Sequence, residues 1–332
     1  MKKLLLCMTV VLTLVACSAD KRFFKQARLA TSKGNFKEAI EFYTRAIKVN
    51  DKNFAAYLNR GVVWERMPAK DVKELQQHRH NAETDYLHAL SLNPRSAEAN
   101  NNLGALYLDM GRPLDATYYL SEAVNLQPNY FTALLNNGLA HQQLGSVSKA
   151  LTYLNRAFAL RQKDPLVLLN RGLLFFEMKN YQGAVSDFSR LLAAQPTHAR
   201  AYLERARALT KLGYPADAYE DLERAVSLKP DYALAYYYMS DLMFRKGEKD
   251  MALGLLSKSK ELSNTYAPAY ELMGDMLSME DPVAATANYK VALKLDPANA
   301  KRYNRKLQFM LSEKGRERIL ASRFYPRKSY GQ

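Results

Sequence analysis

Four asparagines recur at a regular spacing, and they are the first side chains in the sequence that indicate a binding function. Asn102, Asn136 and Asn170 are each 34 residues apart, and Asn59 lies 43 residues before Asn102. A side-chain amide both donates and accepts hydrogen bonds, so a row of amides can hold the backbone of an extended peptide whatever its sequence. The alternative is that these amides bond between neighbouring helices.

Such a row forms only if the chain builds the same unit repeatedly, and the 34-residue period runs through most of the sequence. Small residues follow it at one position of the unit, namely Gly104, Gly138, Gly172, Ala206, Ser240 and Gly274. In residues 97–130, Leu103, Gly104 and Tyr107 share a face of a first helix. Gly111 then turns the chain, and Pro128 ends a second helix. The period therefore predicts stacked helix pairs.

This pattern resembles the tetratricopeptide repeat. Eight units carry it, at residues 20–53, 54–96, 97–130, 131–164, 165–198, 199–232, 233–266 and 267–299, the second with about nine extra residues and the eighth one residue short. The resemblance implies an all-α fold, a right-handed superhelical solenoid. Residues 300–321 are expected to form a capping helix begun by Asn299 or Asp296, and residues 322–332 a basic disordered tail. One elongated domain is expected, because each repeat contacts only its neighbours.

The N-terminus has the features of a signal peptide. Lys2 and Lys3 precede an apolar run from Leu4 to Ala16 that is too short to span a membrane. Residues 14–17, Leu-Val-Ala-Cys, resemble the bacterial lipobox, in which the signal is cut before the cysteine and the cysteine is acylated. The resemblance implies a signal peptide at 1–16 and a lipidated tether at 17–19, with Cys17 as the acylated residue. A plain secretory signal with a chance cysteine is the alternative.

Acylation at Cys17 would anchor the chain in the bacterial envelope. Ser18 resembles the signal for transport to the outer membrane, so the repeats are expected to face the periplasm. The tether spans roughly 10 Å at full extension, and Asp20 or Ser18 is expected to cap the first helix. Because Cys7 would leave with the signal and Cys17 would be modified, no thiol remains for disulfides, catalysis or metal binding.

Basic residues are concentrated near both ends of the chain, whose formal net charge is +15. The basic residues near the N-terminus, which surround Phe23 and Phe24, are Lys21, Arg22, Lys25 and Arg28. They suit contact with an anionic membrane surface, or Phe23 packs in its repeat and the charges are solvated. Residues 301–332 hold ten lysines and arginines against two glutamates. Because the export signal argues against nucleic acid, their expected partners are anionic lipid, an acidic protein or solvent alone.

Arginine and aspartate occur together in three repeats. Arg60, Arg171 and Arg205 share position seven of their repeats, and Asp85, Asp187 and Asp221 share position 23 of the same repeats. Four repeats that lack this arginine have an aromatic residue or leucine at position 23. Arginine thus occurs where aspartate does, as expected if the two form a partly buried ion pair between the two helices. We therefore interpret the six residues as structural.

An apolar stripe lies beside the asparagines. It is made of Leu166, Leu169, Leu173 and Phe176, extended by Leu135 and Leu139, and bordered by Arg200, Arg207 and Lys211. The spacing predicts an exposed hydrophobic patch, and such patches mark contact sites. A peptide with apolar anchors and acidic flanks would fit. The alternatives are self-association into a homo-oligomer and cover by the chain's own tail.

Catalytic motifs are missing from the sequence. There is no phosphate-binding loop, nucleophile elbow or metalloprotease motif, and His78 and His80 fall on different faces of a helix. Neither enzyme activity nor a cofactor is expected. The sequence predicts a membrane-anchored scaffold that binds protein or peptide partners and helps to assemble or regulate an envelope complex. Similar lipoproteins act as adaptors of peptidoglycan hydrolases or in pilus assembly. The alternative is a structural protein whose basic C-terminal end bridges anionic membrane or wall components.

Overall fold

The computed structural model describes residues 19–312 and residue 317, and all regular secondary structure in these residues is helical. The signal peptide at 1–16, the lipid attachment at Cys17, the possible cap at Ser18 and the tail at 322–332 lie outside the described residues. Among the helices that are described, none combines the length and the apolar character needed to cross a membrane.

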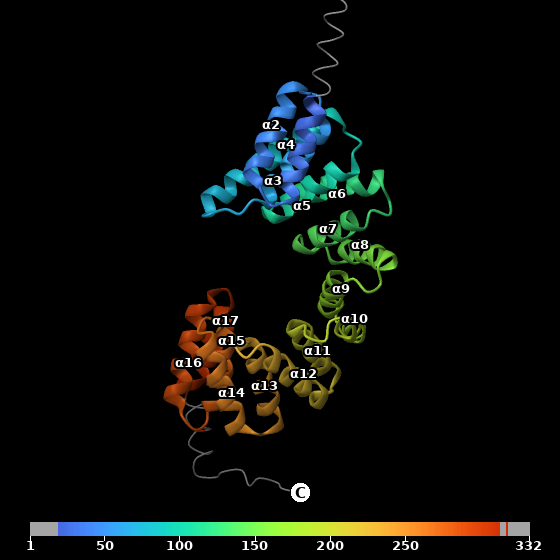
Figure 1. Ribbon diagram of the computed structural model, residues 1–332. Helices are drawn as coiled ribbons and strands as arrows, with labels where there is room; N and C mark the ends of the chain where they lie inside the picture. Colours follow the sequence, from blue (N-terminus) through green and yellow to red (C-terminus); the bar gives the residue numbers. More distant parts are fainter. Residues whose placement is uncertain (1–18, 313–316, 318–332) are drawn as a thin grey trace, which may run out of the picture. The chain divides into compact units, whose positions relative to one another are not determined.

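The chain divides into two compact units, one ending at Leu174 and one beginning at Phe175, where the sequence predicts a single domain. The N-terminal unit contains a helix at 19–32, α2 (Phe36–Val49), α3 (Phe54–Arg66), α4 (Val72–Leu92), α5 (Ala97–Asp109), α6 (Pro113–Leu126), α7 (Phe131–Gln143), α8 (Val147–Leu160) and most of α9 (Pro165–Glu177). The C-terminal unit contains α10 (Tyr181–Ala194), α11 (Ala199–Leu212), α12 (Pro215–Leu228), α13 (Ala233–Lys246), α14 (Lys249–Leu262), α15 (Ala267–Leu277), α16 (Pro282–Leu295), the short 3₁₀ helix η1 (Pro297–Asn299) and α17 (Ala300–Leu311). Within each unit, consecutive helices pack side by side (Figure 1).

Glycine determines how tightly the two helices of a repeat approach. Gly104 on α5 faces Leu120 on α6, and a Cβ atom added to Gly104 would lie 2.5 Å from the Cγ atom of Leu120. Real Cβ atoms do not approach that closely, so alanine at this position would push the helices apart. The period of small residues in the sequence therefore reflects contact between the paired helices.

The turn inside each repeat needs a left-handed backbone. Gly111, Gly145, Gly213 and Gly247 occupy equivalent positions and all have positive φ. Lys179 occupies the same position between α9 and α10 and has a φ of 62°. A residue with a Cβ atom adopts this conformation at a cost that glycine avoids. Lys179 therefore carries local backbone strain that glycine avoids in the equivalent turns.

The extra residues of the second repeat lengthen its second helix. Helix α4 has 21 residues, whereas α6 and α8 have 14 each. The added turns are packed onto the array, because His78 is buried, with its ring 5.5 Å from that of Trp64 and its Nδ1 atom 3.3 Å from the carbonyl oxygen of Met67. The insertion is thus an ordered part of the repeat.

Of the two residues predicted to cap the first helix, Asp20 does not do so, and Ser18 lies outside the described residues. The helix already includes Ala19, so Asp20 lies inside it. The carboxylate of Asp20 is instead buried and accepts hydrogen bonds from the Nδ2 atoms of Asn50, at 3.0 Å, and Asn53, at 2.6 Å. These partners follow α2, so the start of the first helix is fastened to the loop that leads into the second repeat.

The last described helix is shorter than predicted. Helix α17 ends at Leu311, and Ser312 has an extended backbone, whereas the sequence predicts one helix to residue 321. Asn299 precedes α17 without forming a side-chain capping bond. Tyr303 and Met310 are the buried residues of α17, and the helix packs on α16. Residues 300–311 thus cover the last repeat of the C-terminal unit.

Candidate functional site

The first helices of neighbouring repeats lie closer together than the second helices. Direct contacts join α3 with α5 and α5 with α7 in the N-terminal unit, and α13 with α15 in the C-terminal unit. The second helices of the same repeats contact each other less. Within each unit, the first helices therefore form the inner face, and side chains from consecutive repeats can meet there.

The four asparagines of the predicted row all lie on these first helices and are partly exposed. Asn136 donates from Nδ2 to the Oδ1 atom of Asn101 at 3.3 Å, and Asn101 donates to the Oδ1 atom of Asn102 at 3.2 Å. Asn101 is at position five and was missing from the predicted row. The amides of α5 and α7 are therefore connected, but through an additional residue.

The two outer asparagines bond to their own helices. Asn59 donates to the carbonyl oxygen of Ala55 at 2.8 Å, and Asn170 donates to that of Leu166 at 2.7 Å. Within the described residues, the Oδ1 atoms of Asn59, Asn136 and Asn170 accept no hydrogen bond. Each amide therefore presents an acceptor that a peptide N–H group can use.

The predicted exposed apolar patch is wrong in two of its positions. Leu166 is 57% exposed, but Leu135 and Leu169 are only 6% and 8% exposed. Leu135 belongs to a core cluster with Leu134 and Val167, because the close approach of neighbouring first helices covers it. Leu139 and Leu173 are partly buried. Leu166 alone remains as an apolar anchor beside Asn170.

The remaining residues of that patch belong to the C-terminal unit, where they form a different environment. The Arg207 guanidinium lies 4.7 Å from the ring centre of Phe176 and 5.4 Å from that of Tyr238. It donates to the carboxylate of Glu204 at 2.5 Å. Arg200 also approaches Glu204, at 4.0 Å, and Lys211 is exposed. Position six, occupied by asparagine in the earlier repeats, thus contributes a buried carboxylate and a tyrosine here.

Tyrosines extend this environment along α13 toward α15. The ring of Tyr237 lies 5.1 Å from the rings of both Tyr238 and Tyr266. Burial raises the pKa of Tyr266 to about 12, so its hydroxyl remains protonated near neutral pH. The first helices of the C-terminal unit therefore present aromatic rings and paired charges, in contrast to the amides of the N-terminal unit.

Sequence reasoning missed a buried glutamate at the end of this face. Glu271 is 2% exposed and forms ion pairs with Arg302 at 2.6 Å and Lys306 at 2.8 Å. Lys306 also binds Asp275 at 2.6 Å. Comparing position five across the repeats could have revealed this site, because it is leucine in four of the eight repeats and glutamate here. Two of the basic residues assigned to the C-terminal end thus hold α17 to α15.

Two of the three predicted arginine–aspartate pairs are present within the units. Arg60 and Asp85 form bonds of 2.9 Å and 2.7 Å, and Arg205 binds Asp221 at 2.7 Å and 2.6 Å. Burial raises the pKa of Asp85, although Arg60 opposes that shift. These bonds join the two helices of one repeat, as expected of structural pairs.

The third pair remains a prediction, because Arg171 and Asp187 belong to different units. Within its own unit, Arg171 donates to Asn155 at 3.3 Å. Its guanidinium also lies 3.5 Å from the ring centre of Phe158.

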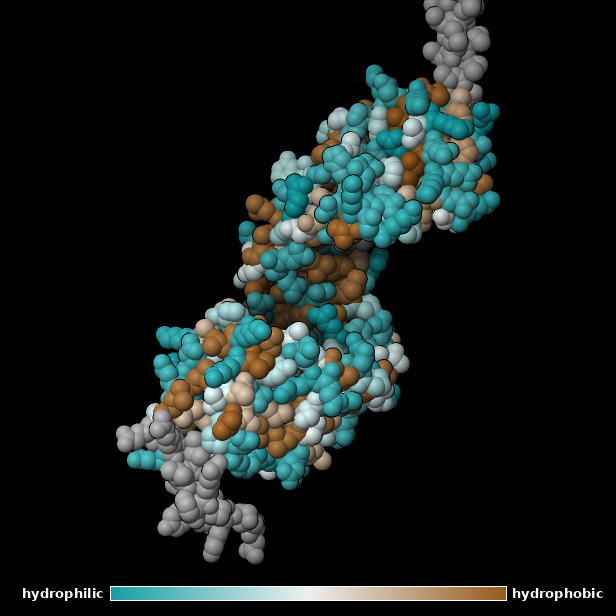
Figure 2. Space-filling view, turned by 90° about the vertical axis from the view of Figure 1, so that its left-hand side faces the viewer, coloured by the Kyte–Doolittle hydropathy of each residue, from teal (hydrophilic) through white to brown (hydrophobic). Residues whose placement is uncertain are grey.

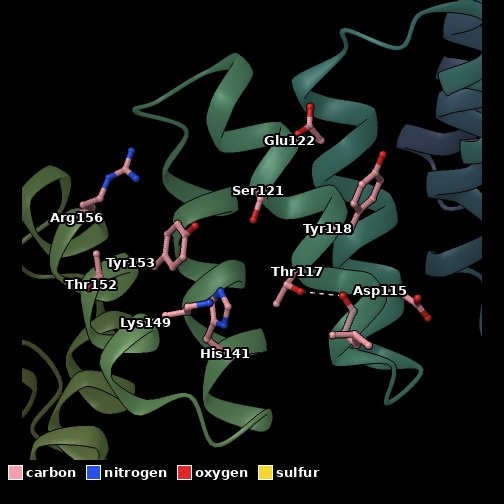
Figure 3. Close-up of a pocket in the computed structure, with 11 residues that line it drawn as sticks. Asp115, Thr117, Tyr118, Ser121, Glu122, His141, Lys149, Thr152, Tyr153 and Arg156 are labelled. Atoms are coloured by element: carbon pink, nitrogen blue, oxygen red, sulfur yellow. Dashed lines mark hydrogen bonds between the residues drawn. The ribbon is translucent and has the colours of Figure 1, made fainter.

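The outer side of the N-terminal unit has a groove of about 860 Å³ between α6 and α8. Figure 3 shows Tyr118 and Ser121 of α6 on one wall and Tyr153 of α8 on the other. His141 from α7 lies between the walls, and its ring stacks on that of Tyr153 with a centre distance of 5.5 Å. The groove therefore combines aromatic rings with hydroxyl and charged groups.

Two polar atoms on α7, the helix that supplies His141 to this groove, are unpaired. The Nδ1 atom of His141 and the Oδ1 atom of Asn137 are buried and have no hydrogen-bond partner. Burial, with a smaller effect of Lys149, lowers the pKa of His141, so its ring stays neutral at pH 7. No cluster of His, Cys, Asp and Glu in the described residues is arranged to hold a metal ion.

Comparison with known families finds tetratricopeptide repeats along the chain. One tetratricopeptide repeat model matches residues 24–71, 106–165, 135–199 and 169–233, and a second matches residues 85–117. No curated protein is significantly similar in sequence.

Several solved structures share the fold. PilF of Pseudomonas aeruginosa has 19% identity and a TM-score of 0.58, with 68% of this chain and 99% of PilF aligned. PilW, described as a type IV pilus biogenesis factor, has 21% identity and a TM-score of 0.55, with 68% and 98% aligned. YrrB, described as having an unusual peptide-binding site, has 22% identity and a TM-score of 0.51, with 58% and 95% aligned.

Proposed function

The chain belongs to the tetratricopeptide repeat family, and we propose that it is a lipid-anchored scaffold that binds protein or peptide partners in a bacterial envelope. The observation that carries this proposal is the row of partly exposed amides on α3, α5, α7 and α9. The side-chain oxygens of Asn59, Asn136 and Asn170 accept no hydrogen bond from another described residue, and the spacing of the row follows the repeat. An extended backbone offers donors to such a row whatever its side chains are.

The burial of the predicted apolar patch bears on the kind of partner that we propose. Leu166 is the exposed apolar residue of the predicted patch, so a ligand segment needs one apolar side chain opposite α9 and not a continuous apolar stripe. Because no catalytic arrangement was recognised in the sequence, we propose binding and not catalysis as the activity. PilW is described as a biogenesis factor of type IV pili, which supports assembly of an envelope complex as a role open to this fold.

The binding surface is tested by crosslinking in cells followed by mass spectrometry. The variant Asn102→Ala, Asn136→Ala, Asn170→Ala should lose crosslinked partners, because three amides of the row are removed. A matched control is Asn81→Ala, Asn125→Ala, which removes amides from the second helices α4 and α6. If the row variant kept every partner of the parent protein, the amide row would not be the binding surface.

Anchoring is tested separately. We propose that Cys17 is acylated and holds the protein on the outer membrane, facing the periplasm. Cys17→Ala should move the protein from the membrane fraction to the soluble periplasmic fraction. Retention in the membrane after a high-salt wash would contradict acylation as the attachment.

The alternative function, in which the basic C-terminal end bridges anionic membrane or wall components, has less support than the scaffold function. Arg302 and Lys306 already form ion pairs with Glu271 and Asp275, which leaves less of their charge for a membrane or wall component. Deleting residues 318–332 should leave protein partners bound, because the proposed binding surface is the amide row on α3, α5, α7 and α9.

A further inference from the structure

The exposed face of the first helix carries a single sign of charge. Residues 21–37 contain six basic residues and no acidic residue. On the helix at 19–32, Lys21, Lys25 and Arg28 follow one another at spacings of four and three, so they share one face. All three are exposed, as is Arg22 beside them. None of these four forms an ion pair with another described residue.

The aromatic residues of this helix point the other way. Phe23 and Phe24 are partly buried and pack against the core that contains Tyr43, and the rings of Phe24 and Tyr43 are 5.7 Å apart. The prediction that these rings join a membrane contact is not supported, because the repeat uses them for packing. Leu29 is the apolar residue on the basic side, and it is 55% exposed.

The helix is firmly attached to the repeat array. Asp20, its only acidic residue, is buried and bonded to Asn50 and Asn53. Its negative charge is therefore withdrawn from the exposed face. These bonds hold the basic face in a defined position on the first two repeats. Cys17 lies three residues before Asp20, so a lipid on Cys17 would be close to this face.

We propose that this face, formed by Lys21, Arg22, Lys25, Arg28 and Leu29, binds the surface of an anionic membrane. A terminal repeat needs a polar outer face for solubility, but solubility alone is served by mixed charges. Basic side chains of one sign are attracted by anionic lipid headgroups, and an exposed leucine among them can enter the interface. In Figure 2, hydrophilic residues cover most of the visible surface of the N-terminal repeats near the top of the view.

This proposal deepens the proposed anchoring, because acylation at Cys17 would bring the face to the bilayer. Acylation and the basic face would have different roles, because the lipid would attach the protein and the basic face would orient its first repeat on the membrane. They are separated by testing the mature chain, residues 17–332 with Cys17→Ala, which cannot be acylated.

The experiment measures co-sedimentation of this unacylated chain with vesicles. It should bind vesicles that contain phosphatidylglycerol, bind little to pure phosphatidylcholine, and dissociate at high salt because the Debye length shortens. Each basic residue near an anionic surface strengthens binding about fivefold. The variant Lys21→Gln, Lys25→Gln, Arg28→Gln should therefore weaken binding about 100-fold at low salt.

A matched control removes the same charge elsewhere. The exposed lysines Lys149, Lys163 and Lys229 changed to glutamine should leave vesicle binding near the parent value. Leu29→Ala should cause a smaller loss than the triple variant and no change in salt dependence. Equal losses in the two triple variants would overturn the proposal, as would binding that depends on residues 318–332 or an absence of binding to anionic vesicles. Such results would leave the crosslinking and Cys17→Ala tests of the proposed function unaffected.

Discussion

The repeats at 131–164 and 199–232 build the same interior position in different ways. In 199–232, Arg205 at position seven bonds twice to Asp221 at position 23. In 131–164, Asn137 takes position seven and Tyr153 takes position 23. Asn137 keeps an unpaired Oδ1 atom there, and His141 keeps an unpaired Nδ1 atom one turn later.

A second hydrogen bond at position seven is common to both repeats and to two others. The residue at position seven donates to the residue at position 25 of the preceding repeat: Thr44 accepts from Arg60, Ser121 from Asn137, Asn155 from Arg171 and Ser189 from Arg205. The bond between repeats is therefore retained while the partner within the repeat changes. The repeats differ in how completely they satisfy their buried polar atoms, and not in how they stack.

Breaking the pair in 199–232 should have the largest effect. Asp221→Ala should lower the free energy of unfolding by about 2–3 kcal/mol, because Arg205 would be left with an uncompensated and mostly buried charge. Urea unfolding monitored by circular dichroism measures the change.

The chain supplies its own control for this prediction. Repeat 97–130 has Leu103 and Tyr119 at the two positions. The double variant Arg205→Leu, Asp221→Tyr should recover most of the lost stability, since no charge remains buried. If the double variant were as unstable as Asp221→Ala, the loss would come from packing around residue 221 and not from the unpaired charge.

Repairing the interior of 131–164 should have an effect of opposite sign. Asn137→Leu, which copies Leu103, should raise the free energy of unfolding by about 1 kcal/mol, because it removes a buried oxygen without a partner. Ser121 loses its donor but faces the groove, where water can replace it. A loss of stability in the same urea experiment would show that the bond to Ser121 outweighs the unpaired oxygen.

A smaller gain is expected at the turn of repeat 165–198. Lys179→Gly should add about 0.5–1 kcal/mol, because glycine adopts positive φ without the steric cost of a Cβ atom. Gly213→Lys is the reciprocal variant and should lose a similar amount. The unfolding temperatures of both variants test whether Lys179 and Gly213, which occupy equivalent positions, differ in backbone strain.

The smallest effect concerns pH. The pKa of His141 is lowered in the folded state, so the unfolded chain binds a proton more readily, and stability falls as pH decreases below about 6.5. His141→Gln should remove that part of the pH dependence while leaving the carboxylate part. Unfolding midpoints compared between about pH 7 and about pH 5 should differ less in the variant than in the parent. Equal pH dependence in both proteins would assign the effect to other groups.

The helix pairs, their small contact residues and the arginine–aspartate coupling could be read from the sequence, because a 34-residue repeat compares each position with its equivalents. The amides were also placed on the first helices. The exposure of Leu135 and Leu169 was predicted incorrectly, since helical spacing tells which side of a helix a residue occupies but not how close the next repeat comes. Asn101 and Glu271 escaped notice because they depart from the apolar residue usual at position five.

The sequence by itself determined the type of repeat, the number of repeats and which side chains occupy equivalent positions, because these depend on local helix periodicity. Only the tertiary structure decided that Asp20 fastens the first helix to Asn50 and Asn53, and that Glu271 binds Arg302 and Lys306. These contacts join residues 30 or more positions apart through side chains outside the repeat pattern. Their formation depends on the distance between packed helices, which the period of a sequence does not contain.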